Sequence, residues 1–491
     1  MSVLRRFFAV PPAASFDPTG AGRLTRTLGV PALIAIGIGS TIGVGIFVLT
    51  GTVAANNSGP ALTLSFLVAG FGCALAALCY AEFAAMLPVS GSAYSYAYAT
   101  LGEGIAWFIG WNLILEYALS ASAVAVGWSG YVVNLLKELG VQMPALLTNA
   151  PLVKGEGGHL AASGALVNLP AVLIIGLLTW LLYVGIRQTS TANAWMVAIK
   201  VAVILVFIGA GLRFVDPALW HPYIPPNTGE FGKFGWSGVL QGAAIIFLSY
   251  IGFDAATTTA LETKNPQRDL PLGIIGALAV SAVLYIAMSM VMTGMVSYTR
   301  LDVEAPVAVA LDVHPQLGWL GPLVKVGAIA GMTSVILTSL LGQPRILMAM
   351  ADDGLVPPVM SRCHPKYKTP HVATVVTGVG AALFAGLFPL DVLGELISIG
   401  ILLAFAIVCI GVLVLRRTRP DAPRAFRVPW APVTCVLGAI VCLAMTFALP
   451  NDTWWRLLIW TAIGFSVYAA YGYRHSRIRD AHPLISQQPR R

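Results

Sequence analysis

Long uncharged apolar stretches alternate along this chain with short polar segments. The longest lies between Arg26 and Glu82, and the turn-forming run from Asn56 to Pro60 divides it into two halves. A helix needs about 20 mostly apolar residues to cross a bilayer, so each half is long enough for one span. Further stretches of this kind are centred near Leu113, Leu177, Val203, Phe247, Ala287, Val335, Ala381, Phe405, Leu437 and Ile463. The pattern predicts an all-α polytopic membrane protein with about twelve transmembrane helices.

Composition and charge agree with a chain that lies in lipid. Hydrophobic residues make up 57% of the sequence and charged residues 10%, whereas a soluble domain has about 25% charged residues. The net charge of +8 would suit nucleic acid, but most of the 29 Lys and Arg residues fall on one side if the spans alternate from a cytoplasmic amino terminus. The positive-inside rule then predicts a multi-pass protein of the inner (cytoplasmic) cell membrane with both termini in the cytoplasm. The bilayer is the expected partner, and nucleic acid is not.

No segment has the composition of a separate soluble domain. The predicted division is a cytoplasmic amino-terminal segment, 1–29; a first five-helix unit, 30–215; a second five-helix unit, 216–415; two further spans, 416–474; and a cytoplasmic tail, 475–491. The outer segment 135–168 is expected to pack over the outer face, and the outer segment 302–319 is expected to form short helices. The cysteines show no metal-ligand or disulfide spacing, so neither a metal nor a bound cofactor is expected.

Two spans are interrupted by residues that weaken a helix. The first contains the run GIGSTIGVGIF, from Gly37 to Phe47, and the sixth contains FLSYIGFDAATTT, from Phe247 to Thr259. Irregular backbone at bilayer depth is tolerated where it lines a cavity. The two runs lie at corresponding positions of the two five-helix units, of which the second must be inverted, and paired broken spans point to a transporter's binding site. Close packing of Gly-rich helices is the alternative explanation.

Broken helices offer backbone groups that match the two charged ends of an amino acid. The helix that restarts near Thr41 to Gly45 has N–H groups for a carboxylate. The carbonyl groups near Ile36 to Gly39 and Phe247 to Ser249 are predicted to be free for an ammonium group. The predicted substrate-binding residues at the two breaks are Ile38, Gly39, Ser40, Thr41, Gly43, Gly45, Phe247, Leu248, Ser249 and Ile251.

Four long motifs follow one another along nearly the whole chain. They are GSTIGVGIF from Gly39, YAEFAAMLPVSGSAYSY from Tyr80, SYIGFDAATTTALETKNPQRDLPLGI from Ser249 and GQPRILMAMADDGLVPP from Gly342. In these motifs the chain resembles the amino acid–polyamine–organocation (APC) superfamily, and most closely the bacterial members of its cationic amino acid transporter family. The resemblance implies a LeuT-type fold, with a five-plus-five inverted repeat, broken helices 1 and 6, and two extra carboxyl-terminal helices.

Lys200 lies in the middle of the fifth span, in the run AWMVAIKVAVILV. A lysine at mid-membrane costs about 2.5–3.5 kcal/mol on insertion scales, so this residue is a candidate proton carrier. The resemblance implies more, because some family members place a lysine here where sodium-coupled relatives bind sodium. It implies proton-coupled symport, with Lys200 bonded to carbonyl groups near Gly39 and to Ser334 or Thr333 in the eighth span.

Other deep residues have roles that the sequence leaves open. Glu116, in the third span, is predicted to line the site, to relay protons or to pair with another helix. Asp254 either caps the restarted half of the sixth span or contacts the substrate. The resemblance places Met332 against the substrate side chain, where it would favour small neutral substrates, unless it only fills the core. Four acids near span ends are interpreted as structural, as partners of arginines or of helix dipoles: Glu82, Glu103, Asp391 and Glu395.

The sequence therefore predicts a secondary active transporter that imports small neutral L-amino acids, such as alanine, by proton symport. Uncoupled or exchange transport of cationic amino acids or polyamines is the alternative, and a transporter-like amino acid sensor is the alternative from another class. No enzyme motif of the form His-Glu-x-x-His or Gly-x-Ser-x-Gly is present. The expected partners are the amino acid substrate and the bilayer, and a small membrane partner stays open.

Overall fold

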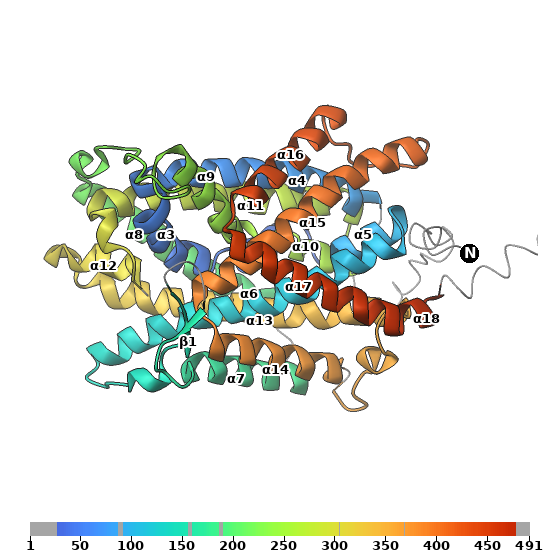
Figure 1. Cartoon of the computed structure of the whole chain (residues 1–491), viewed down its shortest axis with the longest axis horizontal. Coiled ribbons are helices and arrows are strands. Elements are labelled where there is room, and N and C mark those ends of the chain that lie inside the picture. The colour runs from blue at the N-terminus through green and yellow to red at the C-terminus, as the bar shows by residue number, and fades with distance from the viewer. Residues whose placement is uncertain are drawn as a thin grey trace, which may run out of the picture.

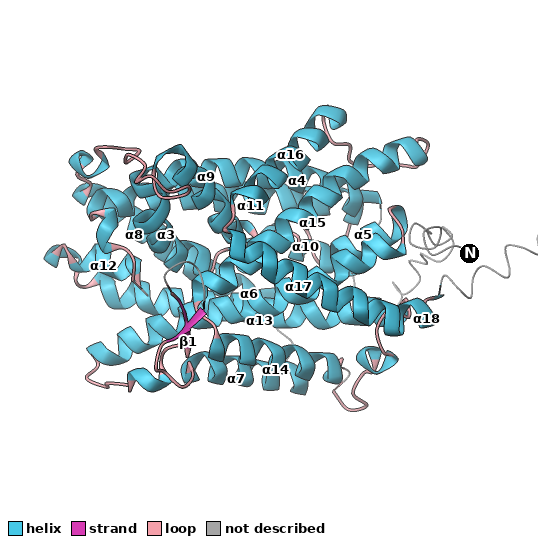
Figure 2. Ribbon diagram, viewed as in Figure 1, coloured by secondary structure: helices cyan, strands magenta, loops and turns pink. Residues whose placement is uncertain are grey.

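The computed structural model describes residues 27–86, 92–155, 160–185, 190–303, 305–367 and 369–477. Within these ranges the chain is almost entirely helical, and most of the long helices run along the long axis of the molecule (Figures 1 and 2). Most of the two predicted terminal segments, 1–29 and 475–491, lies outside the described residues.

The helical elements follow the predicted spans in order. The first span comprises α2 (Val30–Thr41), η3 (Gly45–Leu49), α3 (Thr50–Val53) and η4 (Ala54–Ser58). The sixth comprises α9 (Gly235–Ile246), η10 (Phe247–Tyr250) and α10 (Ala255–Thr258). The other long helices are α4 (Leu62–Met86), α6 (Glu103–Glu138), α7 (Leu169–Val184), α8 (Ser190–Gly211), α11 (Pro266–Met295), α13 (Leu320–Asp352), α14 (His371–Leu387), α15 (Leu390–Thr418), α16 (Ala431–Ala448) and α17 (Asn451–Val467).

The prediction of a polytopic all-α membrane protein is confirmed. In the described residues, 8 helical stretches are long and apolar enough to cross a membrane, and three shorter helices are also apolar. A helical element lies over the centre of every predicted span. Because α6 packs along α13 and α4 packs along α11, the spans of the two predicted five-helix units contact one another throughout the core. The inverted relation between these units stays a prediction.

Short elements mark the two ends of the molecule. Figure 1 shows α12 (Pro306–Asp312) at one end and α18 (Tyr473–His475) at the other, and these names, the α12 end and the α18 end, are used below. The helix α12 confirms the expectation for the outer segment 302–319. The segment 135–168 contains an antiparallel hairpin that was not predicted, formed by β1 (Leu152–Lys154) and β2 (Leu160–Ala162). Three-residue strands are too short to leave an alternating pattern in the sequence.

Buried carboxylates connect the spans near both ends. Glu82 of α4 accepts a hydrogen bond from Arg416 Nε at 3.0 Å and from the Val428 N–H at 2.8 Å, and it pairs with Arg424 at 3.3 Å. The predicted pairing of Glu82 with arginines is thus confirmed. Glu103, the first residue of α6, accepts a hydrogen bond from the Tyr468 hydroxyl at 2.6 Å, which connects α6 to the carboxyl-terminal helices.

Glu395 does more than the expected interaction with a helix dipole. Its carboxylate pairs with Lys154 of the hairpin at 2.5 Å and with Arg456 of α17 at 3.5 Å, and it accepts a hydrogen bond from Thr453 at 3.0 Å. Asp391 keeps the expected local role and accepts a hydrogen bond from the Val392 N–H. The partners of Glu395 lie on separate segments, so only the fold reveals them.

Of the six cysteines, five are buried in the spans and Cys363 is exposed in the segment between α13 and α14. The buried thiols lie in α4, α15 and α16, where the Cys79 and Cys435 sulfur atoms are 3.6 Å apart. Their burial is typical of free cysteines, which pack as small apolar side chains.

Candidate functional site

Both interrupted spans are broken where the sequence predicts. The helix α2 ends at Thr41, and Ile42 is extended, with φ −77° and ψ 101°. In the sixth span, η10 ends at Tyr250, and Ile251 is extended, with φ −65° and ψ 142°. The backbone groups at both points are therefore released from regular helical pairing.

The two breaks contact each other through glycine backbone. A Cβ atom at Gly45 would lie 2.5 Å from the Ser249 Cβ, and a Cβ atom at Gly252 would lie 2.8 Å from the Ser40 Cβ. Gly252 also has a φ of +111°, a conformation that a residue with a side chain rarely adopts. Glycine at these positions allows the first and sixth spans to meet. Close packing also applies to Gly43, whose Cβ would lie 3.0 Å from Val335.

We expect Gly252→Ala to destabilise the protein more than Gly229→Ala does. Both glycines have positive φ, +111° and +99°, and a side chain in such a conformation costs about 1–3 kcal/mol. Only at Gly252 would the added methyl also overlap another segment, whereas nothing lies within 4 Å at Gly229. The apparent Tm of each purified variant measures the difference. Equal Tm losses would show that the contact with Ser40 contributes nothing.

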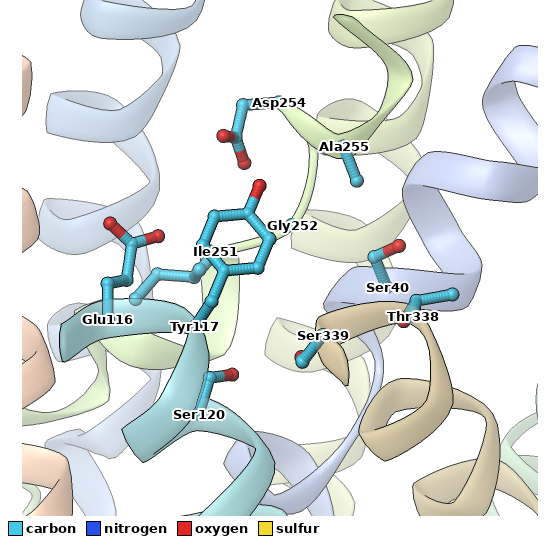
Figure 3. Close-up of a pocket in the computed structure, with 10 residues that line it drawn as sticks. All are labelled: Ser40, Glu116, Tyr117, Ser120, Ile251, Gly252, Asp254, Ala255, Thr338 and Ser339. Carbon is cyan, nitrogen blue, oxygen red and sulfur yellow. The ribbon is translucent and has the colours of Figure 1, made fainter. Parts of the chain in front are cut away.

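A small cavity lies beside the two breaks, near the middle of α6 and α13. Its lining comes from the first, third, sixth and eighth spans (Figure 3). The lining residues are Ser40, Glu116, Tyr117, Ser120, Ile251, Gly252, Asp254, Ala255, Thr338 and Ser339. Its volume is about 20 Å³, which is room for a water-sized group. A larger ligand requires the walls to move apart.

Two carboxyl groups face this cavity, and none of its lining residues is basic. Glu116 is 3% exposed and Asp254 is 2% exposed. Asp254 accepts a hydrogen bond from the Ser92 hydroxyl at 3.1 Å, and Figure 3 shows the Tyr117 hydroxyl pointing toward it. Since buried carboxylates need a compensating partner, the arrangement suits an ammonium group or a proton. The predicted capping role of Asp254 is wrong, because it occupies the N-cap position of α10 without a capping hydrogen bond from its side chain.

Lys200 contacts the break in the first span and is not on the cavity lining. Its ammonium group donates to the Gly39 carbonyl at 2.8 Å, to the Ile42 carbonyl at 3.1 Å and to the Ser334 hydroxyl at 2.7 Å. These are the predicted contacts, with Ser334 as the partner from α13. All three donors of the ammonium group have an acceptor. Within the described residues Lys200 makes no ion pair, so uncharged groups alone hold this fully buried cation.

Tyr285 of α11 joins the two breaks, although no sequence pattern distinguishes it. Its buried hydroxyl lies 2.9 Å from the Thr41 carbonyl oxygen and 2.8 Å from the Ser249 carbonyl oxygen. Tyr285 stands in an apolar run of its span, where a single hydroxyl does not indicate which neighbour it will contact. Only the fold shows that one side chain reaches a carbonyl group of each broken span.

Most carbonyl groups that were predicted to be free have donors from the protein. Besides the contacts of Lys200 and Tyr285, the donor–acceptor pairs are Ser40 Oγ with Ile36 O, Thr41 Oγ1 with Gly37 O, the Ile42 N–H with Ile38 O, and the Ile251 N–H with Leu248 O. The prediction of free carbonyl groups is wrong for these positions. Serine and threonine hydroxyls bond back to the carbonyl four residues earlier in a helix, which the sequence argument did not consider.

Three of the predicted site residues, Ser40, Glu116 and Ile251, line the cavity. The other predicted residues at the breaks are not on its lining: Ile38, Gly39, Thr41, Gly43, Gly45, Phe247, Leu248 and Ser249. Met332 does not line it. Met332 lies two turns before Ser339 on α13, about 10 Å nearer the α12 end. Its role as a wall of the substrate pocket stays a prediction.

Four hydroxyl-bearing residues on the lining were not predicted: Tyr117, Ser120, Thr338 and Ser339. They come from α6 and α13, which pack against each other. The signal in the sequence was a hydroxyl group within an apolar span, repeated in the third and eighth spans at similar depth. Without the packing of the two helices, this signal does not separate a cavity wall from an ordinary core position.

A larger cavity, of about 1230 Å³, opens near the α12 end. Its lining includes Leu49 and Thr52 of the first span, Ile245 of α9, and the ion pair of Lys154 with Glu395. Leu49 lies about one helical turn beyond Gly45. Along the first span, the contact of Gly45 with Ser249 therefore lies between Leu49, on this cavity, and Ser40, on the small cavity.

Comparison with known proteins confirms the resemblance of the four motifs. Residues 28–468 match the amino acid permease family. The chain is 46% identical over 453 residues to the methylthioribose transporter of Bacillus subtilis (strain 168), covering 92% of this chain and 95% of that protein. It is 45% identical over 463 residues to the branched-chain amino acid permease BcaP of the same organism (94% and 96%). It is 42% identical over 402 residues to the vacuolar cationic amino acid transporter 4 of Arabidopsis thaliana (82% and 65%). The chain belongs to the amino acid permease family of the APC superfamily.

Proposed function

We propose that this protein imports amino acids by proton-coupled symport and favours small neutral ones such as alanine. Membership of a transporter family supports amino acid transport and excludes the enzyme alternative. The observation that carries the coupling is the set of three hydrogen bonds made by Lys200 at the first break. The proton is the proposed coupling ion, and the amino acid substrate and the bilayer are the proposed partners.

Protonation of Lys200 determines how firmly the first span is held. The ammonium form has three N–H donors for the Gly39 carbonyl, the Ile42 carbonyl and the Ser334 hydroxyl. The neutral amine has two donors and a lone pair, so it can keep both carbonyl groups only if the Ser334 hydroxyl donates to it and gives up its hydrogen bond to the Gly331 carbonyl. Loss of the proton therefore weakens the connection between α8, the first break and α13. In the proposed cycle, this change frees the first span to move away from the eighth.

The carboxyl groups of Glu116 and Asp254 provide the binding surface for the substrate's ammonium group. Both are buried, and both face the cavity between the broken spans. Glu116 also remains a candidate proton relay to Lys200. The N–H groups at the start of the restarted helix, near Gly43 to Gly45, are the proposed partners of the substrate carboxylate. Because the cavity is small, alanine requires less widening than a longer side chain.

The same acid pair favours cationic amino acids or polyamines as a second candidate substrate class. Two carboxylates can accept both an α-ammonium and a side-chain cation, and the vacuolar plant relative is a cationic amino acid transporter by name. An uncharged sugar such as methylthioribose, named for another relative, would leave both carboxyl groups unpaired. A buried unpaired charge is costly, so this substrate is disfavoured.

The proposed arrangement is that of a LeuT-type carrier with the α18 end in the cytoplasm. The larger cavity near the α12 end then faces outward, and the Gly45–Ser249 contact closes the route from it to the small cavity. In alternating access, the Gly45–Ser249 contact would open in the outward-facing state. The walls of the small cavity would move apart toward the α18 end in the inward-facing state.

The test is uptake of radiolabelled alanine into proteoliposomes of the purified protein, with and without an inward proton gradient. We expect accumulation above equilibrium only with the gradient, and competition by small neutral amino acids. Competition by leucine, arginine, spermidine and methylthioribose in the same assay compares the substrate classes. Equilibration without accumulation would contradict proton coupling, and stronger competition by arginine or spermidine would favour the cationic class.

A further inference from the structure

Tyr285 holds one carbonyl group from each broken span with a single hydroxyl. The carbonyl oxygens of Thr41 and Ser249 lie 2.9 Å and 2.8 Å from it. A tyrosine hydroxyl has one proton, so it cannot give a full hydrogen bond to both acceptors at once. One of the two carbonyl groups is therefore always under-satisfied in this arrangement. The Tyr285 side chain is fully buried.

The two carbonyl groups belong to residues that are close in sequence to the cavity lining. Thr41 directly follows Ser40, and Ser249 lies two residues before Ile251; both Ser40 and Ile251 are on the cavity lining. A substrate ammonium group has three N–H donors, so it can donate to both carbonyl oxygens, which the hydroxyl cannot do fully, and keep its third donor for a carboxyl group of the cavity. The same two acceptors are thus suited to a protein donor and to a ligand donor.

We propose that Tyr285 is a positioning residue whose hydroxyl gives way to the ammonium group of the substrate. In the unloaded carrier the hydroxyl bonds to the Thr41 and Ser249 carbonyl groups and holds the two breaks together. In the loaded carrier the ammonium group takes over these acceptors. The inference rests on the proposed amino acid transport, and it adds that substrate binding must displace an internal donor. Tyr285 thereby lowers the affinity for the substrate and speeds its release.

Tyr250 offers a matched control in the same aromatic cluster. Its ring centroid lies 5.3 Å from that of Tyr285, and both side chains are fully buried. The Tyr250 hydroxyl also donates to a backbone carbonyl, that of Phe66 at 2.9 Å, but Phe66 belongs to the unbroken helix α4. Replacing either tyrosine with phenylalanine removes one buried hydroxyl, and only Tyr285→Phe releases carbonyl groups of the breaks.

The experiment compares alanine uptake and alanine binding for wild type, Tyr285→Phe and Tyr250→Phe. We expect Tyr285→Phe to lower the KM and the Kd for alanine about tenfold. Without the tyrosine hydroxyl, the Thr41 and Ser249 carbonyl groups gain a larger free energy from bonding to the substrate's ammonium group. Tighter binding slows release, so kcat should fall with KM. Tyr250→Phe should leave KM within about twofold of wild type. A merely structural role predicts the opposite for Tyr285→Phe, namely weaker binding or less folded protein at unchanged KM.

Other outcomes decide against the proposal. An unchanged or raised KM in Tyr285→Phe, or an equal fall in Tyr250→Phe, would overturn it. If Tyr285→Phe does not fold, Tyr285→Met also removes the hydroxyl and should lower the KM in the same way, so an unchanged or raised KM there overturns the proposal as well. Wild-type protein that binds alanine without accumulating it would refute proton coupling and leave this comparison intact. Wild-type protein that binds no amino acid would refute both.

Discussion

Replacing Lys200 with alanine is expected to abolish accumulation of alanine against its gradient. The change removes the donor to the Gly39 and Ile42 carbonyl groups and to Ser334, and with it the proposed site of the coupling proton. A gradient of one pH unit can support about tenfold accumulation for each symported proton. The variant should instead reach equilibrium at a ratio of about one. Proteoliposomes with a fixed inward proton gradient measure this ratio directly.

Two comparisons separate coupling from folding in this experiment. Lys200→Met keeps most of the aliphatic volume of the side chain and removes the amino group, so it should behave as Lys200→Ala does. Lys325→Ala removes another buried lysine, which lies near the α12 end of α13 and pairs with Glu138. This control should still accumulate alanine, because Lys325 does not touch either break. Full accumulation by both Lys200 variants would refute the proposed role.

The largest loss of stability is expected for Glu82→Gln. The carboxylate is 1% exposed and pairs with Arg424, whose side chain is only 5% exposed, and with Arg416. The variant leaves a buried guanidinium without its counter-charge, and removing one partner of a buried pair costs about 3–5 kcal/mol. The amide also loses one acceptor for the Val428 N–H. Thermal unfolding of the purified variant in detergent measures the loss as a lower apparent Tm.

Glu262→Gln is the matched control for this loss. Glu262 and Arg345 are 3.9 Å apart, and each side chain is 33% exposed. Such partly exposed pairs contribute about 0–1 kcal/mol, so the Tm should change little. If both glutamates gave the same small change, the buried carboxylate would not stabilise the connection between α4 and α15.

The spans and their breaks could be predicted because their physical causes are local. Apolar stretches of membrane length must be helical, since lipid offers no partner for the backbone. The runs from Gly37 to Phe47 and from Phe247 to Thr259 combine glycine with polar residues, and the structure breaks the helix inside both. The position of Lys200 was also informative, because a mid-membrane lysine is costly unless it has acceptors, and the family resemblance placed these acceptors in the first and eighth spans.

The rest of the site depends on contacts between distant segments. Tyr285 could not be selected, because its importance comes from two carbonyl oxygens on other spans. The carbonyl groups predicted to be free were satisfied by hydroxyls whose local bonding was overlooked, as at Thr41. The hairpin was not predicted because its three-residue strands are too short to leave an alternating pattern. The partners of Glu395 were not predicted because the pairing of Lys154 with α15 joins segments that no local pattern relates.

The burial of five cysteines leaves the native chain with one accessible thiol, at Cys363. A maleimide dye, spin label or affinity tag can therefore be attached at a single site without engineering a cysteine-free background. Because Cys363 lies in the segment between α13 and α14, at the α18 end, a membrane-impermeant reagent also reports sidedness. Labelling of inverted vesicles but not of intact cells would place the α18 end in the cytoplasm. The reverse pattern would place the α18 end outside the cell.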